Sequence, residues 1–197
     1  MRLGKDFYKQ DAVTVAKKLI GKLLVRILKG EKVICRIVET EAYVGPEDKG
    51  CHAYQNKKTK RTKVMFNSGG CVYVYLIYGI HNCFNIVTNE KDKPEAVFIR
   101  AVEPLTGFEL IRKNRDIQSK KAEDLTNGPG KLTQALEIDK EFNGYDLVTG
   151  DRIYIKADEK NIEYQVVSGE RVNIDYAEEY KEKLWRFYIK ENSFVSN

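Results

Sequence analysis

The sequence predicts an α+β protein in a single domain, residues 1–197, built on a largely antiparallel β-sheet. Three observations support this prediction. Short runs rich in β-branched and aromatic residues recur along the chain and are joined by short turns. Helical patterns occur only near the start and in the middle of the chain. The length suffices to bury one substantial core, and no internal repeat divides the sequence.

The first predicted elements are a helix and two paired strands. Asp11 is a suitable N-cap for a helix over residues 11–20. The apolar strand 22–28 and a second strand over 33–43, "VICRIVETEAY", pair across the turn "KGEK". The second strand ends with the acids of "ETE", residues 39–41, just before a glycine and a proline. We therefore expect carboxylates at the mouth of the sheet.

The most basic segment of the chain follows. Residues 56–63, "NKKTKRTK", carry five positive charges and no acid. Such a run is usually a solvated loop, and the alternative is contact with nucleic-acid phosphates. The net charge of +5 permits a polyanionic partner without requiring one.

The stretch "VYVYLIYGIHNCFN", residues 72–85, is unusually rich in tyrosine. Its alternation places Tyr73 and Tyr75 on one face of a strand, and Gly79 permits a bend near residues 78–82 before a second β run. Tyrosines that bury their rings in a strand and keep their hydroxyls wet explain this pattern without a ligand. The other interpretation is a platform that stacks on bases, with Tyr78 as a protruding wedge.

Residues 95–104, "EAVFIRAVEP", form the next predicted strand, in which Arg100 lies among apolar residues and needs an anionic partner. A helix is expected over 106–114. A further helix should begin near Lys131, after "GPG", where free amides and the helix dipole could bind a phosphate, although an ordinary capped helix explains the pattern equally well. The segment is not a P-loop, because it lacks the earlier glycine and the Ser or Thr after the lysine.

The last third, with "DRIYIKA", "EYQVVSGERVNI" and "LWRFYI", is expected to add further strands. The amino terminus interrupts its apolar residues with lysines, so neither a signal peptide nor a membrane span is expected, and the protein is predicted to be cytoplasmic. A metal site of Cys51, His52, Cys71 and Cys83 is conceivable, but their spacings match no recurring zinc pattern. We expect no metal and no cofactor.

Few side chains could carry chemistry. Glu39 and Glu41 point to the same face of their strand, and Tyr43 follows two residues later. A carboxylate beside an aromatic ring is suited to hydrolysis at a sugar carbon, where it activates water. The two acids could equally be salt-bridge partners of the basic segment. No Gly-x-Ser-x-Gly motif is present, and the histidines have no obvious nucleophile nearby in sequence, so acyl transfer is disfavoured.

Six blocks together resemble the alkyladenine (3-methyladenine) DNA glycosylases, and they occur in that family's order over nearly the whole chain. They are "RIVETEAYVGPEDKGCHAY" (36–54), "MFNSGGCVYVYLIYGIHNCFNIVT" (65–88), "IRAVEP" (99–104), "GPGKLTQALEI" (128–138), "RVNIDYA" (171–177) and "LWRFYI" (184–189). The resemblance, which is to a compact bacterial form, implies a curved sheet flanked by helices, similar to the C-terminal domain of formyltransferases. It also implies a monofunctional base-excision repair enzyme that acts on 3-methyladenine, 7-methylguanine or hypoxanthine.

The resemblance also implies roles for individual residues. Glu41 matches the general base that activates water for attack on the sugar C1′ of a flipped-out nucleotide, and Arg100 and the carbonyl of Val172 match groups that hold this water. Tyr43, His52 and Tyr75 match the walls around the extruded base. Asn85 matches the residue that rejects guanine, and Tyr78 matches the side chain inserted into the duplex. The expected contacts with the DNA backbone, which combine this alignment with the helix start described above, are Thr59, Arg61, His81 and Lys131.

The predicted partner is therefore double-stranded DNA with damaged purines, bound by a monomer that associates with the nucleoid. Two other functions remain open at this point. A non-catalytic nucleic-acid-binding module would have no use for Glu41 and Arg100 converging on one water. A nucleoside hydrolase would have little need for Tyr78 or the basic segment.

Overall fold

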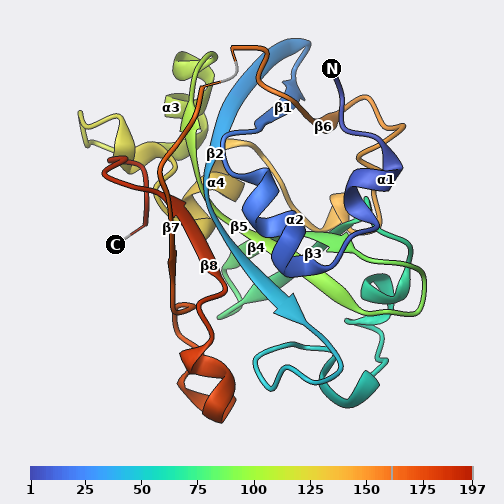
Figure 1. Ribbon diagram of the computed structural model, residues 1–197. Coiled ribbons are helices and arrows are strands. Elements are labelled where there is room, and N and C mark those ends of the chain that lie inside the picture. The colour runs from blue at the N-terminus through green and yellow to red at the C-terminus, as the bar shows by residue number, and fades with distance from the viewer. Residues whose placement is uncertain (161, 197) are drawn as a thin grey trace.

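The computed structural model describes residues 1–160 and 162–196. Its core element is one antiparallel sheet, which within the described residues has eight strands in the order β3-β4-β5-β2-β1-β6, with β8 paired to β2 and β7 to β8 (Figure 1). The strands are β1 (Leu23–Leu28), β2 (Glu31–Val44), β3 (Val72–Ile77), β4 (His81–Thr88), β5 (Glu95–Pro104), β6 (Ile153–Lys156), β7 (Val166–Gly169) and β8 (Arg186–Ile189). The predicted α+β class with a largely antiparallel sheet is confirmed.

The α-helices are α1 (Lys5–Tyr8), α2 (Ala12–Leu19), α3 (Phe108–Arg115) and α4 (Pro129–Ala135), and the longest 3₁₀ segment is η5 (Asp175–Glu182). The backbone of Thr14 donates to the side chain of Asp11, which confirms Asp11 as the N-cap of α2. Helix α4 begins two residues earlier than predicted, because the fixed φ of Pro129 suits the first helical position. No helix in the described part of the chain is both long enough and apolar enough to cross a membrane.

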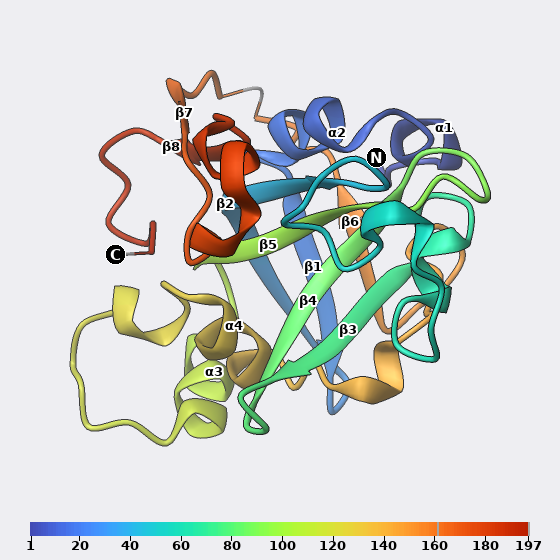
Figure 2. The ribbon, with the colours of Figure 1, turned by 90° about the horizontal axis from the view of Figure 1, so that it is seen from below.

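Helix α2 packs on β2, and α4 packs on β4. In Figure 2, α1 and α2 lie on one side of the sheet, while α3 and α4 lie together at another edge of the molecule. The large hydrophobic core contains Val72, Val74 and residues of α2, whereas Tyr73 belongs to a smaller cluster with Met65 and Phe66. The side chains on the two faces of β3 therefore pack in two different clusters, as the alternation of the sequence predicted.

Strand β2 pairs with three other strands of the sheet. Its first half pairs with β1 and its second half with β8, while β5 runs along its other edge. The register with β5 shifts between Ile37 and Glu39 and again between Glu39 and Thr40. Bulges of this kind bend a strand and re-aim its side chains. The irregularity therefore falls at the acids that the sequence places near the strand end.

One strand prediction was too long. Of "EYQVVSGERVNI" only β7 is a strand, and residues 170–174 form a loop that leads into η5. The side chain of Arg171 in this loop is fully buried in an ion pair, so the loop is held by side-chain contacts rather than by a sheet ladder. Alternating apolar residues alone could not reveal this difference.

Candidate active site

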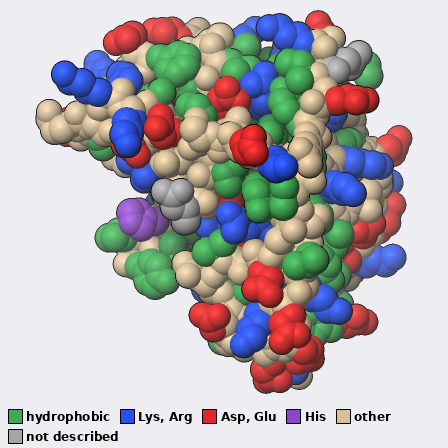
Figure 3. Space-filling model, turned by 60° about the vertical axis from the view of Figure 1, so that its left-hand side comes forward, with side chains coloured by type: hydrophobic (Ala, Val, Ile, Leu, Met, Phe, Trp, Pro, Cys, Tyr) green, Lys and Arg blue, Asp and Glu red, His purple; other side chains and the backbone are tan. Residues whose placement is uncertain are grey.

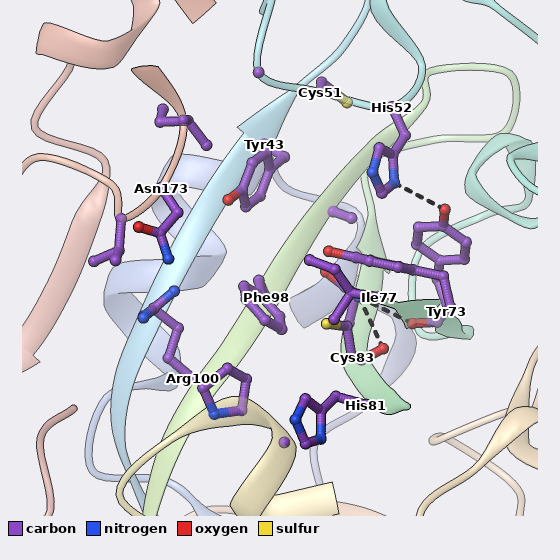
Figure 4. A pocket seen from close by; sticks show the side chains of 18 of the residues that line it. Tyr43, Cys51, His52, Tyr73, Ile77, His81, Cys83, Phe98, Arg100 and Asn173 are labelled. Carbon is purple, nitrogen blue, oxygen red and sulfur yellow. Dashed lines mark hydrogen bonds between the residues drawn. The ribbon is translucent and has the colours of Figure 1, made fainter. Parts of the chain in front are cut away.

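A pocket of about 350 Å³ is lined by residues of β3, β4 and β5 and by the end of β2, and its size is within the range of small-ligand sites. Tyr43 from β2 faces the pocket from one side, and His52 with Tyr73 faces it from the other (Figure 4). Of the residues predicted for the site, most line the pocket: Tyr43, His52, Tyr75, Tyr78, His81, Asn85, Arg100 and Val172. The fold thus gathers residues from five separate parts of the sequence.

Glu41 is completely buried next to this pocket. Its Oε2 accepts a hydrogen bond of 2.9 Å from the Tyr43 hydroxyl, and its Oε1 accepts one of 2.7 Å from the Val172 amide. Burial raises the pKa of Glu41, and the charge of Arg100 and these two hydrogen bonds oppose that rise. An ionised carboxylate with a raised pKa is a stronger base, which suits proton abstraction from water.

Arg100, for which the sequence predicted an anionic partner, has two, Glu39 and Glu41. Its Nε donates to Oε1 of Glu39 at 3.1 Å, and its Nη1 lies 3.4 Å from Oε1 of Glu41. Glu39 and Glu41 therefore share one face of β2, as their spacing predicted. Both carboxylates form ion pairs with Arg100. The alternative prediction, that they pair with the basic segment 56–63, is therefore wrong.

Val172 contacts Glu41 through its amide nitrogen, and the predicted role of its carbonyl stays a prediction. The neighbouring Arg171 fixes this loop. Its guanidinium forms two hydrogen bonds, of 2.5 and 2.8 Å, with the buried carboxylate of Asp48, and a third with the carbonyl of Ala42. The same guanidinium lies 4.7 Å from the centroid of the Tyr43 ring. The Asp48–Arg171 pair thereby holds the loop against the end of β2.

The opposite wall is a chain of three side chains. Arg61 lies 3.1 Å from Nε2 of His52, and Nδ1 of His52 lies 3.0 Å from the Tyr73 hydroxyl. Because a guanidinium only donates, Nε2 must accept, so we assign the proton of the neutral ring to Nδ1. Burial, together with the smaller effect of the positive charge of Arg61, lowers the pKa of His52 to about 4. His52 is therefore neutral at pH 7.

Tyr75 completes this wall. Its ring lies edge-on to His52, with 4.6 Å between ring centroids, and the Arg61 guanidinium is 4.7 Å from its centroid. Arg61 contacts both rings of this wall and is itself exposed, and its expected contact with the DNA backbone stays a prediction. The hydroxyl of Tyr73, which shares this face of β3, is hydrogen-bonded to His52.

Asn85 lies on the pocket floor and is nearly completely buried. Its side-chain amide donates to the carbonyls of Tyr73 and Cys83, each at 3.2 Å. With both amide hydrogens held by the backbone, the plane of this amide is fixed.

Tyr78 lies at the tip of the β3–β4 hairpin, within the predicted bend. Its side chain is 81% exposed, and its backbone has a left-handed φ of 54°, next to Gly79 at 72°. A positive φ is a strained conformation for a bulky residue. Leu76 and Ile80 are also largely exposed beside it. The hairpin thus presents apolar side chains outward, at the rim of the pocket.

The other candidate DNA contacts lie around this rim or away from it. His81 packs against Gly130 at the start of α4, where an added Cβ would lie 3.0 Å from the imidazole ring. Thr59 hydrogen-bonds Thr62 within the basic segment, and Lys131 donates to Asn127. On the face shown in Figure 3, basic and acidic side chains are interspersed and acidic ones gather at the lower end. The excess positive charge therefore does not form one uniform basic face in this view.

Sequence reasoning missed several residues of the site. Asp48 and Arg171 form a buried ion pair beside the loop residue Val172, and Ser196 hydrogen-bonds Glu39. Asn173 lines the pocket and has a left-handed φ of 59° (Figure 4). No local pattern marks Asp48, Arg171 or Ser196, because their partners are far away in sequence. Within residues 1–160 and 162–196, no group of three or more His, Cys, Asp or Glu side chains is arranged to hold a metal ion.

Comparison with known proteins shows the family of this chain. Residues 6–193 match the family described as methylpurine-DNA glycosylase (MPG). A protein of Natranaerobius thermophilus is 63% identical over 196 residues, covering 100% of this chain and 99% of that protein. Proteins of Desulfitobacterium hafniense and Clostridium novyi are 48% and 49% identical over 201 residues, each covering 99% of this chain and 98% of the relative. All three carry the name "Putative 3-methyladenine DNA glycosylase".

The blocks that hold Glu41, Arg100 and the tyrosine hairpin all fall inside the matched residues, and the match leaves out only short segments at the two ends. The chain belongs to the methylpurine-DNA glycosylase family.

Proposed function

We propose that this protein hydrolyses the N-glycosidic bond of alkylated or deaminated purines, namely 3-methyladenine, 7-methylguanine and hypoxanthine, that are flipped out of double-stranded DNA. The observation that carries the proposal is Glu41, a buried carboxylate held by Tyr43, Val172 and Arg100 at the edge of an aromatic pocket. The names of the relatives support the same activity.

In the proposed reaction Glu41 accepts a proton from a water molecule. The water oxygen forms a bond to the sugar C1′, the C1′–N bond breaks, and its electron pair leaves with the base. Arg100 and the carbonyl of Val172 hold the attacking water. General-base catalysis of this kind contributes about 10²- to 10⁴-fold. A neutral leaving base needs a proton as well, and His52 does not supply it as an imidazolium at pH 7, because its pKa is about 4.

Recognition of the base follows from the walls of the pocket. The base stacks between Tyr43 on one side and His52 with Tyr75 on the other, and Asn85 on the floor excludes guanine by obstructing its exocyclic amino group. Extrusion of a nucleotide costs a few kcal/mol. Base stacking contributes about 1–3 kcal/mol per ring, and Tyr78 inserted into the vacated space adds a similar amount. Together these contacts offset the cost of extrusion.

Water, rather than a lysine, is the proposed nucleophile. Among the described residues that line the pocket there is no lysine, so no side chain is placed to form a Schiff base with the sugar. We therefore propose a monofunctional enzyme without a strand-cleaving lyase step. It acts as a monomer in the cytoplasm, at the nucleoid.

The test is base release from a hypoxanthine-containing duplex oligonucleotide under single-turnover conditions. The wild type should release hypoxanthine, and Glu41→Gln should bind the same duplex but release it at least 10²-fold more slowly. Binding without release by the wild type would favour the non-catalytic module. Equal cleavage of free inosine would favour a nucleoside hydrolase, and an unimpaired Glu41→Gln enzyme would refute the role of Glu41.

A further inference from the structure

A second buried carboxylate lies next to Glu41, and the proposed mechanism does not use it. Glu39 is fully buried at the bulge of β2. Burial of a carboxylate costs several kcal/mol unless charges and hydrogen bonds compensate it. The hydrogen-bond partners of Glu39 therefore indicate its role in the site.

These partners come from three distant segments. Oε1 of Glu39 accepts from Nε of Arg100 on β5 at 3.1 Å and from Nε of Arg186 on β8 at 2.6 Å. Ser196, near the carboxyl end of the chain, donates its hydroxyl to Oε1 at 3.0 Å and its amide to Oε2 at 2.7 Å. Both oxygens of the carboxylate are thus satisfied, and Arg186 supplies a charge of its own.

The consequence for Arg100 is that each nitrogen of its guanidinium has a separate partner. Nε donates to Glu39, Nη2 donates to the Ser196 hydroxyl at 3.2 Å, and Nη1 faces Oε1 of Glu41 at 3.4 Å. The guanidinium is planar and rigid, so hydrogen bonds at two of its nitrogens prevent the whole plane from turning about the Cδ–Nε bond. Glu39 and Ser196 therefore determine where Nη1 lies relative to Glu41.

Arg186 also balances the charge of this group. Glu39 alone would compete with Glu41 for the single positive charge of Arg100. Arg186 binds Glu39 at the shortest of these distances, and its Nη2 also donates to the carbonyl of Ser196 at 3.4 Å. Two guanidinium groups thus face two carboxylates, and the charge of Arg100 remains available to Glu41.

We propose that Glu39 and Ser196 are positioning residues that hold Arg100 in the orientation required at Glu41, so that the carboxyl-terminal segment takes part in the active site. This inference rests on the proposed glycosylase function for its effect on rate. The orientation of Arg100 itself can be tested without activity.

The test is a double-mutant cycle with Ser196→Ala and Arg100→Ala. Misplacement of a catalytic group by about 1 Å costs up to about 10²-fold, so we expect Ser196→Ala to lower the single-turnover rate about 10-fold or more. Its affinity for a duplex with a tetrahydrofuran abasic-site analogue should stay within about twofold of wild type. In the Arg100→Ala background, Ser196→Ala should have no further effect, because Ser196 acts through Arg100.

Three further variants separate positioning from a general effect on folding. Ser196→Thr keeps both donors and should be close to wild type, whereas Ser196→Pro loses the amide donor as well as the hydroxyl and should be worse than Ser196→Ala. Ser193→Ala is the matched control, because Ser193 lies exposed in the same segment. Additive losses in the Arg100→Ala background, or an unchanged rate in Ser196→Ala, would overturn the proposal.

A second measurement distinguishes failure of this inference from failure of the proposed function. The Nε–H of Arg100 should exchange slowly with solvent in NMR spectra of wild type and Ser193→Ala, and faster in Ser196→Ala and Glu39→Gln. If the wild type releases no base but this difference is present, the proposed function fails and the positioning of Arg100 stands. Equal exchange in all four proteins refutes the positioning whatever the activity.

Discussion

The hydroxyl of Tyr43 donates a hydrogen bond of 2.9 Å to the buried carboxylate of Glu41, so one side chain is both a wall of the pocket and a contact of the candidate base. Burial raises the pKa of Glu41, and this hydrogen bond counteracts the rise because it stabilises the ionised form. The shape of the pocket and the strength of the base are therefore linked through Tyr43.

Tyr43→Phe should separate these two roles, because it keeps the ring and removes the hydrogen bond. A hydrogen bond to a charged group contributes about 1.5–3 kcal/mol, or roughly one to two pKa units. The pKa of Glu41 should rise, and since the proposed base acts when ionised, the acid limb of the rate profile should move about one pH unit higher. The measurement is the single-turnover rate of hypoxanthine release against pH. A uniform loss at every pH would instead indicate a displaced ring.

Tyr78→Ser should impair excision from duplex DNA far more than from single strands, because only the duplex leaves a gap to be filled. Loss of a wedge worth a few kcal/mol predicts a decrease of roughly 10-fold or more on the duplex. Tyr78→Phe is the matched control, which retains the ring and should retain activity. Equal losses on both substrates would support a packing role for the hairpin tip.

Asp48→Asn should destabilise the whole protein, because it leaves the buried Arg171 without its counter-charge. Breaking a buried ion pair costs about 3–5 kcal/mol, so the urea midpoint should fall clearly. Lys49→Ala is the neighbouring control. Lys49 pairs with Glu178 and Glu179 at the surface, and its removal should leave the midpoint unchanged. Comparable effects of the two variants would contradict a structural role for the Asp48–Arg171 pair.

His52 should titrate near pH 4, well below the ordinary value of 6.5. Because the unfolded chain binds this proton more readily, the contribution of neutral His52 to stability is present above about pH 6.5 and is lost as the pH falls towards 4. NMR titration can follow it directly, since the chain has only two histidines and His81→Asn assigns the signals. Arg61→Ala should raise the pKa of His52, because it removes a nearby positive charge. An unchanged pKa in that variant would contradict the contact between Arg61 and the ring.

Local patterns in the sequence were sufficient for much of the fold. The N-cap of α2, the pairing of β1 with β2 and the β3–β4 hairpin all depend on contacts between residues close in the chain. The shared face of Glu39 and Glu41 follows from the two-residue period of a strand, with both side chains reaching Arg100. The resemblance to a known family added further residues that line the pocket, among them His52, Asn85 and Val172.

The sequence by itself thus determined the strand that carries Glu41 and Tyr43, the hairpin that carries Tyr78, and the family. Only the tertiary structure decided which buried charged side chains contact one another. Asp48 and Arg171 are 123 residues apart, and Glu39 and Ser196 are 157 apart. It also placed the Arg61 guanidinium against the ring of Tyr75 and made residues 170–174 a loop. The physical reason is that strand and turn preferences act over a few residues, whereas a buried charge is stabilised only by the partner that the completed fold brings to it.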